Sequence, residues 1–127
     1  MAAVSRYARP VFIVFAVLYA IGVVVQFFLA GLGLLGGETM QAHNDLGWMM
    51  HTLIIPFLVL ALLSGLPRPL LIMAIALTVI MLVQPFWVTE FRGEVLGALH
   101  VLGALIIFGL ARDVAEQGVK LWRGAKA

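Results

Sequence analysis

Four long apolar runs divide this chain of 127 residues, and each is long enough to cross a membrane as a helix. The hydrocarbon core of a bilayer is about 30 Å thick, a distance that takes about 20 helical residues. We place the runs at residues 11–32, 42–63, 70–88 and 93–111. Hydrophobic residues make up 64% of the chain and charged residues only 11%, a composition far from that of a soluble domain. The sequence therefore predicts a single all-α integral membrane domain.

The connections between the apolar runs are short and contain glycine and proline. Pro10 precedes the first run, where proline suits the first turn of a helix. This run is longer than the apolar core of a cleaved signal peptide, so we expect it to be retained. Helices joined by short connections pack antiparallel to their neighbours, which predicts an up-down-up-down four-helix bundle. Residues 112–127 would form a tail that could lie on the membrane surface as a short amphipathic helix.

The basic residues indicate how such a bundle is oriented. Two precede the first run, one lies between the second and third, and four follow the fourth: Arg6, Arg9, Arg68, Arg112, Lys120, Arg123 and Lys126. All of these fall at one end of the predicted bundle, and Arg92 alone falls at the other. Because basic residues favour the cytoplasmic side, we expect both termini to be cytoplasmic. The basic residues are too scattered to form a patch that would bind nucleic acid.

Two histidines, His51 and His100, fall well inside apolar runs. An imidazole surrounded by hydrocarbon needs a polar partner, so a histidine within the membrane is a candidate functional residue. Counted from the expected helix starts, both lie about 10 to 14 Å from the outer boundary. This matching depth, on two helices that run in the same direction, predicts that His51 and His100 are the axial ligands of one haem b. The chain has no cysteine, so the haem would be held without a covalent bond.

Three further polar residues fall in the same half of the predicted membrane domain: Gln26, Gln84 and His43. We consider them candidates for binding a quinone or exchanging protons, although glutamines in membrane helices also act as interhelical hydrogen-bonding groups. His43 lies eight residues before His51, about 12 Å along the helix and about 80° around it. One haem is therefore not expected to use both of these histidines as axial ligands.

Glycines near the two buried histidines could leave room for a flat cofactor, which cannot enter an interior packed at normal density. Gly97 and Gly103 lie about one turn on either side of His100, and Gly47 lies one turn before His51. We include these three glycines among the haem-binding candidates. Stripes of small residues also promote close packing of helices, and that interpretation stays open.

Two prolines inside the apolar runs free backbone carbonyls. Pro56 cannot donate a hydrogen bond to the carbonyl of Thr52, and Pro85 cannot donate to that of Met81. Prolines at such positions kink helices. A kink beside His51 or Gln84 could widen a pocket.

Four short segments of the chain carry a resemblance to known proteins: Tyr-Ala-Arg-Pro at residues 7–10, Val-Val-Gln-Phe-Phe-Leu-Ala-Gly-Leu-Gly at 24–33, Ala42-His43 leading to Gly47 and His51, and Ala-Leu-His at 98–100. In these segments the chain resembles a family of small bacterial four-helix membrane proteins of unknown function. The resemblance covers nearly the whole chain and implies a multi-pass protein of the bacterial plasma membrane. In arrangement, one histidine on each of two helices is similar to membrane b-type cytochromes and to the haem-bearing halves of haem A synthase.

These expectations favour electron transfer as the function. Two imidazole ligands leave the iron no open position for oxygen, so we expect an electron carrier or a quinone-linked oxidoreductase. Electrons would pass between a quinone in the bilayer and a protein partner at the outer face.

Two other interpretations stay open. The histidines could instead fasten helices together in a non-catalytic accessory or assembly subunit of a membrane complex. The outer end could alternatively bind a metal ion such as copper, because thioether and imidazole ligands suit it. The residues that would supply those ligands are Met40, Met49, Met50, His43 and His51.

Overall fold

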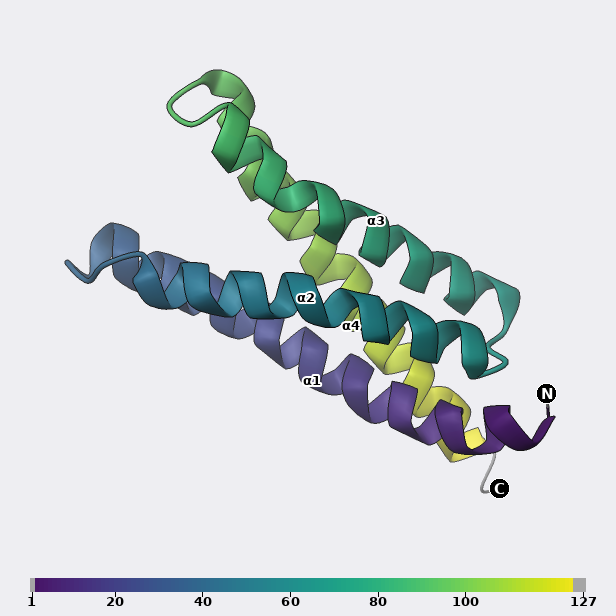
Figure 1. Ribbon diagram of the computed structural model, residues 1–127. Helices are drawn as coiled ribbons and strands as arrows, with labels where there is room; N and C mark the ends of the chain where they lie inside the picture. The colour runs from purple at the N-terminus through teal and green to yellow at the C-terminus, as the bar shows by residue number, and fades with distance from the viewer. Residues whose placement is uncertain (1, 125–127) are drawn as a thin grey trace.

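The computed structural model describes residues 2–124, and almost all of that length is helical (Figure 1). In this range the α-helices are α1 (Ala2–Leu35), α2 (Gln41–Leu63), α3 (Arg68–Glu90) and α4 (Leu99–Gly124), and a 3₁₀ turn, η1 (Val95–Ala98), precedes α4. Each of the four long helices is long and apolar enough to cross a membrane. The expectation of an all-α chain with four such helices is therefore confirmed.

The four helices form a bundle in which consecutive helices run antiparallel (Figure 1). Both α1 and α3 contact α2 and α4, so α1 lies diagonally opposite α3, and α2 lies diagonally opposite α4. The two termini lie at one end, together with the turn between α2 and α3, and we call this the termini end. The connections at residues 36–40 and 91–94 lie at the other end, which we call the histidine end. In Figure 1 the α1–α2 hairpin and the α3–α4 hairpin diverge toward the histidine end.

Apolar side chains fill the bundle from its middle to the termini end. Phe12 of α1 and Phe57 of α2 are fully buried with ring centroids 5.2 Å apart, and the Tyr19 ring lies 5.5 Å from that of Phe57. Leu77 of α3 and Val114 of α4 are buried in the same core. Burial of a large apolar side chain contributes roughly 1.5–3 kcal/mol, so this part of the bundle holds the four helices together.

The buried core stops before the histidine end. None of the described residues in the stretches 24–49 and 85–106 is buried, although these stretches include the ends of all four long helices. The two hairpins are therefore not closely packed against each other here, in agreement with their divergence in Figure 1. His43 and His100 lie within these two stretches, and His51 lies just beyond them.

Arg9 fastens the turn between α2 and α3 to α1. Ser64 follows the last residue of α2, and Gly65 comes next with a φ of +58°, a left-handed conformation that suits glycine. The Arg9 guanidinium donates to the carbonyl oxygens of Ser64 at 3.1 Å and Gly65 at 2.9 Å. Carbonyls at the end of a helix lack helical donors and favour a cation nearby. The contact therefore explains how this short turn is held.

The first helix begins earlier than the sequence predicts. α1 starts at Ala2 and runs through Pro10, which stands inside the helix instead of in its first turn. Proline removes the hydrogen bond to the carbonyl four residues back, here that of Arg6. Because Arg6 is exposed, water can serve this carbonyl in place of the missing donor.

The fourth helix continues well past its predicted end at residue 111. α4 runs without a break to Gly124, so the expectation of a separate tail from residue 112 is wrong; residues 125–127, which include Lys126, lie outside the described range. Val114, Ala115 and Gly118 are buried at the spacing of one helical face. This apolar face packs into the bundle, which is why the helix does not end at the first charged residue.

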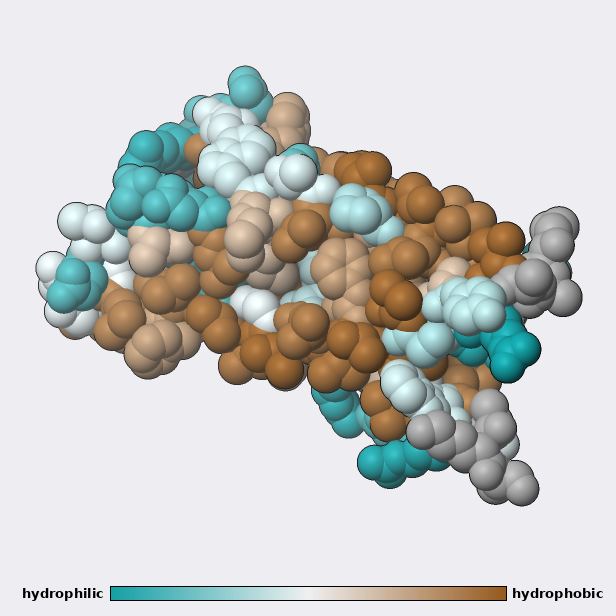
Figure 2. Space-filling model, turned by 60° about the horizontal axis from the view of Figure 1, so that its bottom comes forward, coloured by the Kyte–Doolittle hydropathy of each residue, from teal (hydrophilic) through white to brown (hydrophobic). Residues whose placement is uncertain are grey.

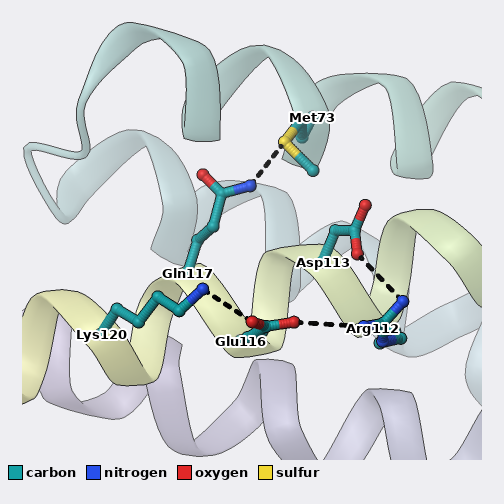
Figure 3. Close-up of polar contacts among 6 residues, drawn as sticks. All are labelled: Met73, Arg112, Asp113, Glu116, Gln117 and Lys120. Carbon is teal, nitrogen blue, oxygen red and sulfur yellow. Dashed lines mark hydrogen bonds and ion pairs between the residues drawn. The ribbon is translucent and has the colours of Figure 1, made fainter.

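The opposite face of this extension is charged, as Figure 3 shows. Lys120 contacts Glu116 at 2.6 Å, and Arg112 contacts the same carboxylate at 3.5 Å. The Gln117 amide reaches across to α3 and donates to Met73 Sδ at 3.2 Å. Figure 2 shows hydrophilic residues toward both ends of the visible surface and hydrophobic residues between them.

Candidate functional site

His51 of α2 is hydrogen-bonded to the backbone of α3. Its Nδ1 lies 3.2 Å from the carbonyl oxygen of Met81. Pro85, four residues further along α3, has no N–H with which to serve that carbonyl. The imidazole therefore takes the place of the missing helical donor and ties α2 to α3. The sequence predicted the free carbonyl but not its partner.

His100 of α4 and Gln84 of α3 are joined by two hydrogen bonds. His100 Nδ1 lies 3.2 Å from the backbone carbonyl oxygen of Gln84, and the Gln84 side-chain Nε2 donates to the His100 carbonyl at 2.6 Å. The Gln84 side chain is buried. Gln84, which the sequence suggested for quinone binding, thus holds His100 and the start of α4 against α3.

His43 of α2 contacts both a neighbouring helix and another histidine. Its Nδ1 lies 3.1 Å from the backbone carbonyl oxygen of Gln26 on α1. Its ring lies against that of His100, with centroids 6.3 Å apart and ring planes at 75°. Because His43 and His100 belong to different hairpins, this contact connects the two hairpins where they diverge.

The three imidazoles share one hydrogen-bonding pattern. A carbonyl oxygen can only accept a hydrogen bond, so each Nδ1 must carry the hydrogen. In a neutral imidazole this leaves a lone pair on Nε2, the form of histidine that binds a metal. Histidine ligands commonly donate their other N–H to a carbonyl, which fixes the tautomer and the ring orientation. Among the described residues, no hydrogen bond reaches the Nε2 of His43, His51 or His100.

His51 and His100 are both hydrogen-bonded to backbone carbonyls of α3. The carbonyls that they contact, those of Met81 and Gln84, are three residues apart, or about 4.5 Å along the helix. Residues with this spacing share a helix face. Both rings are therefore anchored to neighbouring carbonyls of one helix. The histidine rings in contact within the described part of the chain are those of His43 and His100.

The space beside the three candidate glycines is occupied by protein groups. A Cβ atom at Gly47 would come within 2.9 Å of Gln26 Nε2, and one at Gly103 would overlap Gln84 Oε1. A Cβ atom at Gly97 would meet a backbone carbonyl of the preceding connection. This differs from the expectation of empty space for a flat cofactor, because the glycines admit the two glutamine side chains at close range instead.

The two glutamine side chains each leave one polar atom unpaired. Gln26 Oε1 and Gln84 Oε1 are buried and have no hydrogen-bond partner among the described residues. An unsatisfied buried acceptor costs about 1–3 kcal/mol. Each oxygen could therefore accept a hydrogen bond from a small molecule that carries a hydroxyl group.

The structure lends no support to the metal site suggested by the methionines. No group of three or more histidine, aspartate or glutamate side chains that could hold a metal ion occurs in the described part of the chain. Met40 packs against Gly33 and Met50 against Gly22, both on α1, while Met49 is exposed. These side chains fill space beside small residues and do not converge on a histidine.

Two contacts of the site region were not anticipated from the sequence. The Tyr19 hydroxyl of α1 donates to the Met50 carbonyl of α2 at 3.2 Å, and the Trp48 ring lies 5.5 Å from that of His51. The second contact has a sequence signal, because residues three apart share a helix face. The first joins two helices, and no local pattern marks it.

Comparison with known proteins gives no indication of what the three histidines do. No model of a protein family matches the chain, and no curated protein and no solved structure is similar to it.

Proposed function

We propose that the protein is a membrane b-type haem protein that transfers electrons. It spans the bacterial plasma membrane with both termini on the cytoplasmic side, an orientation supported by the basic residues at the termini end. One non-covalent haem b is held at the histidine end by two imidazoles, one of which is His100.

The observation that carries this proposal is the shared tautomer of the three histidines. Each donates from Nδ1 to a backbone carbonyl of a neighbouring helix and keeps an unpaired Nε2. Metal-ligating histidines are oriented in this way. Placing three imidazoles in an apolar bundle is costly, and a ligand role gives a reason for retaining them.

The donor chemistry of the histidine end suits a haem. Neutral imidazole nitrogen is a common axial ligand of haem iron. None of the described residues in 24–49 and 85–106 is buried, so a haem held here would lie between the diverging ends of the hairpins and not inside the apolar core. A bound haem supplies reversible one-electron chemistry, and two imidazole ligands leave no open position for oxygen.

The two buried amide oxygens support a quinol as the redox partner within the bilayer. Gln26 Oε1 and Gln84 Oε1 both lack a donor, and a quinol hydroxyl would supply one. Electrons would then pass between a quinone and a protein partner at the face of the membrane that the histidine end reaches. This makes the protein an electron carrier or a quinone-linked oxidoreductase.

A second candidate function is that of a non-catalytic accessory or assembly subunit in a larger membrane complex. It is favoured by the same Nδ1 bonds, which fasten α2 to α1 and to α3, and α4 to α3. Interhelical hydrogen bonds of this kind stabilise membrane bundles without a cofactor. In that case the Nε2 atoms would have no role.

Measurements of haem content and stability on three proteins distinguish the haem protein from the accessory subunit. The proteins are the wild type, His100→Ala and His100→Asn, produced with ample haem and purified in detergent. The asparagine side-chain N–H can replace Nδ1–H but offers no counterpart to Nε2. We expect one haem per wild-type chain, and we expect both variants to lose the haem or to hold it in a high-spin form. A haem-free wild type, with His100→Asn as stable as the wild type and His100→Ala less stable, would support the subunit instead.

A further inference from the structure

The contact between the His43 and His100 rings identifies a pair of ligands that the sequence does not suggest. The ring centroids are 6.3 Å apart, and the residues lie on α2 and α4, the diagonal pair of the bundle. From the matching depth of the two residues, the sequence instead predicts that His51 and His100 are the ligand pair and that His43 has a separate role. The two pairings can be compared by their anchors, the backbone carbonyls to which each Nδ1 is hydrogen-bonded.

The anchors of His43 and His100 lie on opposite helices. His43 Nδ1 is bound to the Gln26 carbonyl on α1, and His100 Nδ1 to the Gln84 carbonyl on α3. Because α1 and α3 are themselves diagonal, the two rings extend from opposite sides of the bundle. The two nitrogens of an imidazole face nearly opposite directions, so anchoring each Nδ1 on the outer side of the pair leaves each Nε2 on the side away from its anchoring helix.

The anchors of His51 and His100 lie on the same helix. His51 Nδ1 is bound to the Met81 carbonyl, one turn of α3 away from the Gln84 carbonyl that holds His100. Both imidazoles of this pair are therefore held by one helix, and among the described residues the ring of His100 contacts that of His43, not that of His51. Two axial ligands must approach the iron from opposite faces of the porphyrin, an arrangement that anchors on two opposite helices favour over anchors on one helix.

The spacing of the rings also favours His43 and His100. A metal-bound imidazole nitrogen lies about 2 Å from the metal, so two ligands on opposite sides have ring centroids about 6 Å apart. The observed separation is 6.3 Å. A pair of ligands with this spacing needs little movement of the backbone to hold a metal ion between them.

The burial of neighbouring residues also favours His43 and His100 as the ligand pair. His43 and His100 lie in the stretches 24–49 and 85–106, which contain no buried residue within the described chain. His51 instead follows Met50, which is buried in the core. A porphyrin between His43 and His100 would lie where the hairpins diverge.

We propose that His43 and His100 are the two axial ligands of the haem, and that His51 is a structural residue that ties α2 to α3. This inference rests on the proposed haem-binding function and specifies the ligand pair of that site. It also makes the haem a bridge between the two hairpins, because His43 belongs to one hairpin and His100 to the other.

The test compares His43→Asn, His51→Asn and His100→Asn with the wild type. Each asparagine keeps a donor for the carbonyl and removes the ligand nitrogen. The measurements are haem per chain, the spin state of the ferric iron by electron paramagnetic resonance, and far-ultraviolet circular dichroism as a check of folding. We expect His51→Asn to retain a low-spin haem and the other two variants to lose the haem or become high-spin. Free imidazole should restore the low-spin spectrum of His43→Asn.

A low-spin, bis-imidazole haem in His43→Asn would overturn the ligand assignment, whatever His51→Asn does. Wild-type protein that is folded but binds no haem would overturn the proposed function and this inference together, so the two failures are distinguishable. His43→Met provides a second variant should His43→Asn fail to fold. Because methionine is itself an axial ligand and raises the potential of haem iron, we expect a higher midpoint potential, and an unchanged potential and spectrum would contradict the assignment.

Discussion

His51 Nδ1 and the Met81 carbonyl oxygen, 3.2 Å apart, compensate for a hydrogen bond that Pro85 removes from α3. Two features that are unfavourable separately, a proline inside a helix and an imidazole in an apolar bundle, become compatible when they are paired. The contact also sets the tautomer of His51. At His51, and likewise at His43 and His100, the hydrogen bond from Nδ1 to a carbonyl joins two helices and leaves Nε2 unpaired.

The pairing of His51 with the carbonyl freed by Pro85 predicts that the two residues are energetically coupled. His51→Ala should lower the free energy of unfolding by about 1–3 kcal/mol, because the Met81 carbonyl is left unpaired. In a Pro85→Ala background the restored N–H serves that carbonyl, so the same change should cost less than about 1 kcal/mol. A double-mutant cycle of unfolding in detergent measures this coupling. Equal costs in the two backgrounds would show that the histidine does not replace the helical donor.

The contact between Gly103 and the Gln84 amide predicts that a single methyl group disturbs the site. Gly103→Ala should destabilise the bundle by about 1–3 kcal/mol, because its Cβ overlaps Gln84 Oε1. The matched control is Gly109→Ala on the same helix, where a Cβ has no neighbour within 4 Å. This control should be neutral or slightly stabilising, because alanine favours helix. Indistinguishable unfolding curves for the two variants would argue against the close contact.

The contacts of Arg9 predict a stabilising role beyond its charge. Arg9→Gln should cost about 1.5–3 kcal/mol, because the guanidinium bonds to the carbonyls of Ser64 and Gly65 are lost. Arg6→Gln removes the same charge from an exposed position near the start of α1 and should change stability by less than about 0.5 kcal/mol. Thermal unfolding of the two purified variants gives the comparison. A similar loss in both would indicate that net charge, not the turn contact, matters.

The burial of Val114 predicts that the last part of α4 belongs to the bundle. Val114→Ala should reduce the free energy of unfolding by about 1–3 kcal/mol, because Val114 is fully buried. Val101→Ala, at a position that is 60% exposed on the same helix, should have an effect within about 0.5 kcal/mol. Chemical unfolding in detergent distinguishes these outcomes. A negligible effect at Val114 would restore the interpretation of a separate tail.

The long apolar runs allowed the helices to be predicted because the length of a membrane span is a physical requirement that composition reveals. The predicted bounds of α2 and α3 are accurate to within two residues. The start of α4 was predicted at residue 93 but lies at Leu99, because residues 95–98 form the 3₁₀ turn η1. The start of α1 and the end of α4 were missed for one common reason. Both helices continue into charged segments, and a search for apolar runs stops at the first charges.

The histidine site was only partly predictable. His100 was expected seven residues into its helix, but it is the second residue of α4. His51 and His100 nevertheless contact carbonyls of α3 that lie within one turn of each other. The sequence could not identify the contact between His43 and His100, because that contact depends on the rotation of α2 and α4 and on the 3₁₀ turn before α4. The partners of Gly47 and Gly103 were likewise hidden, since a glycine marks close approach without naming what approaches.

One absorption measurement decides whether imidazoles at the histidine end hold a haem. The dithionite-reduced minus air-oxidised difference spectrum of the purified wild-type protein, produced with ample haem, should show the α and β bands of a b-type cytochrome. Their intensity should correspond to one haem per chain. A folded, monodisperse protein with no absorption above that of its aromatic side chains would contradict the proposed haem site.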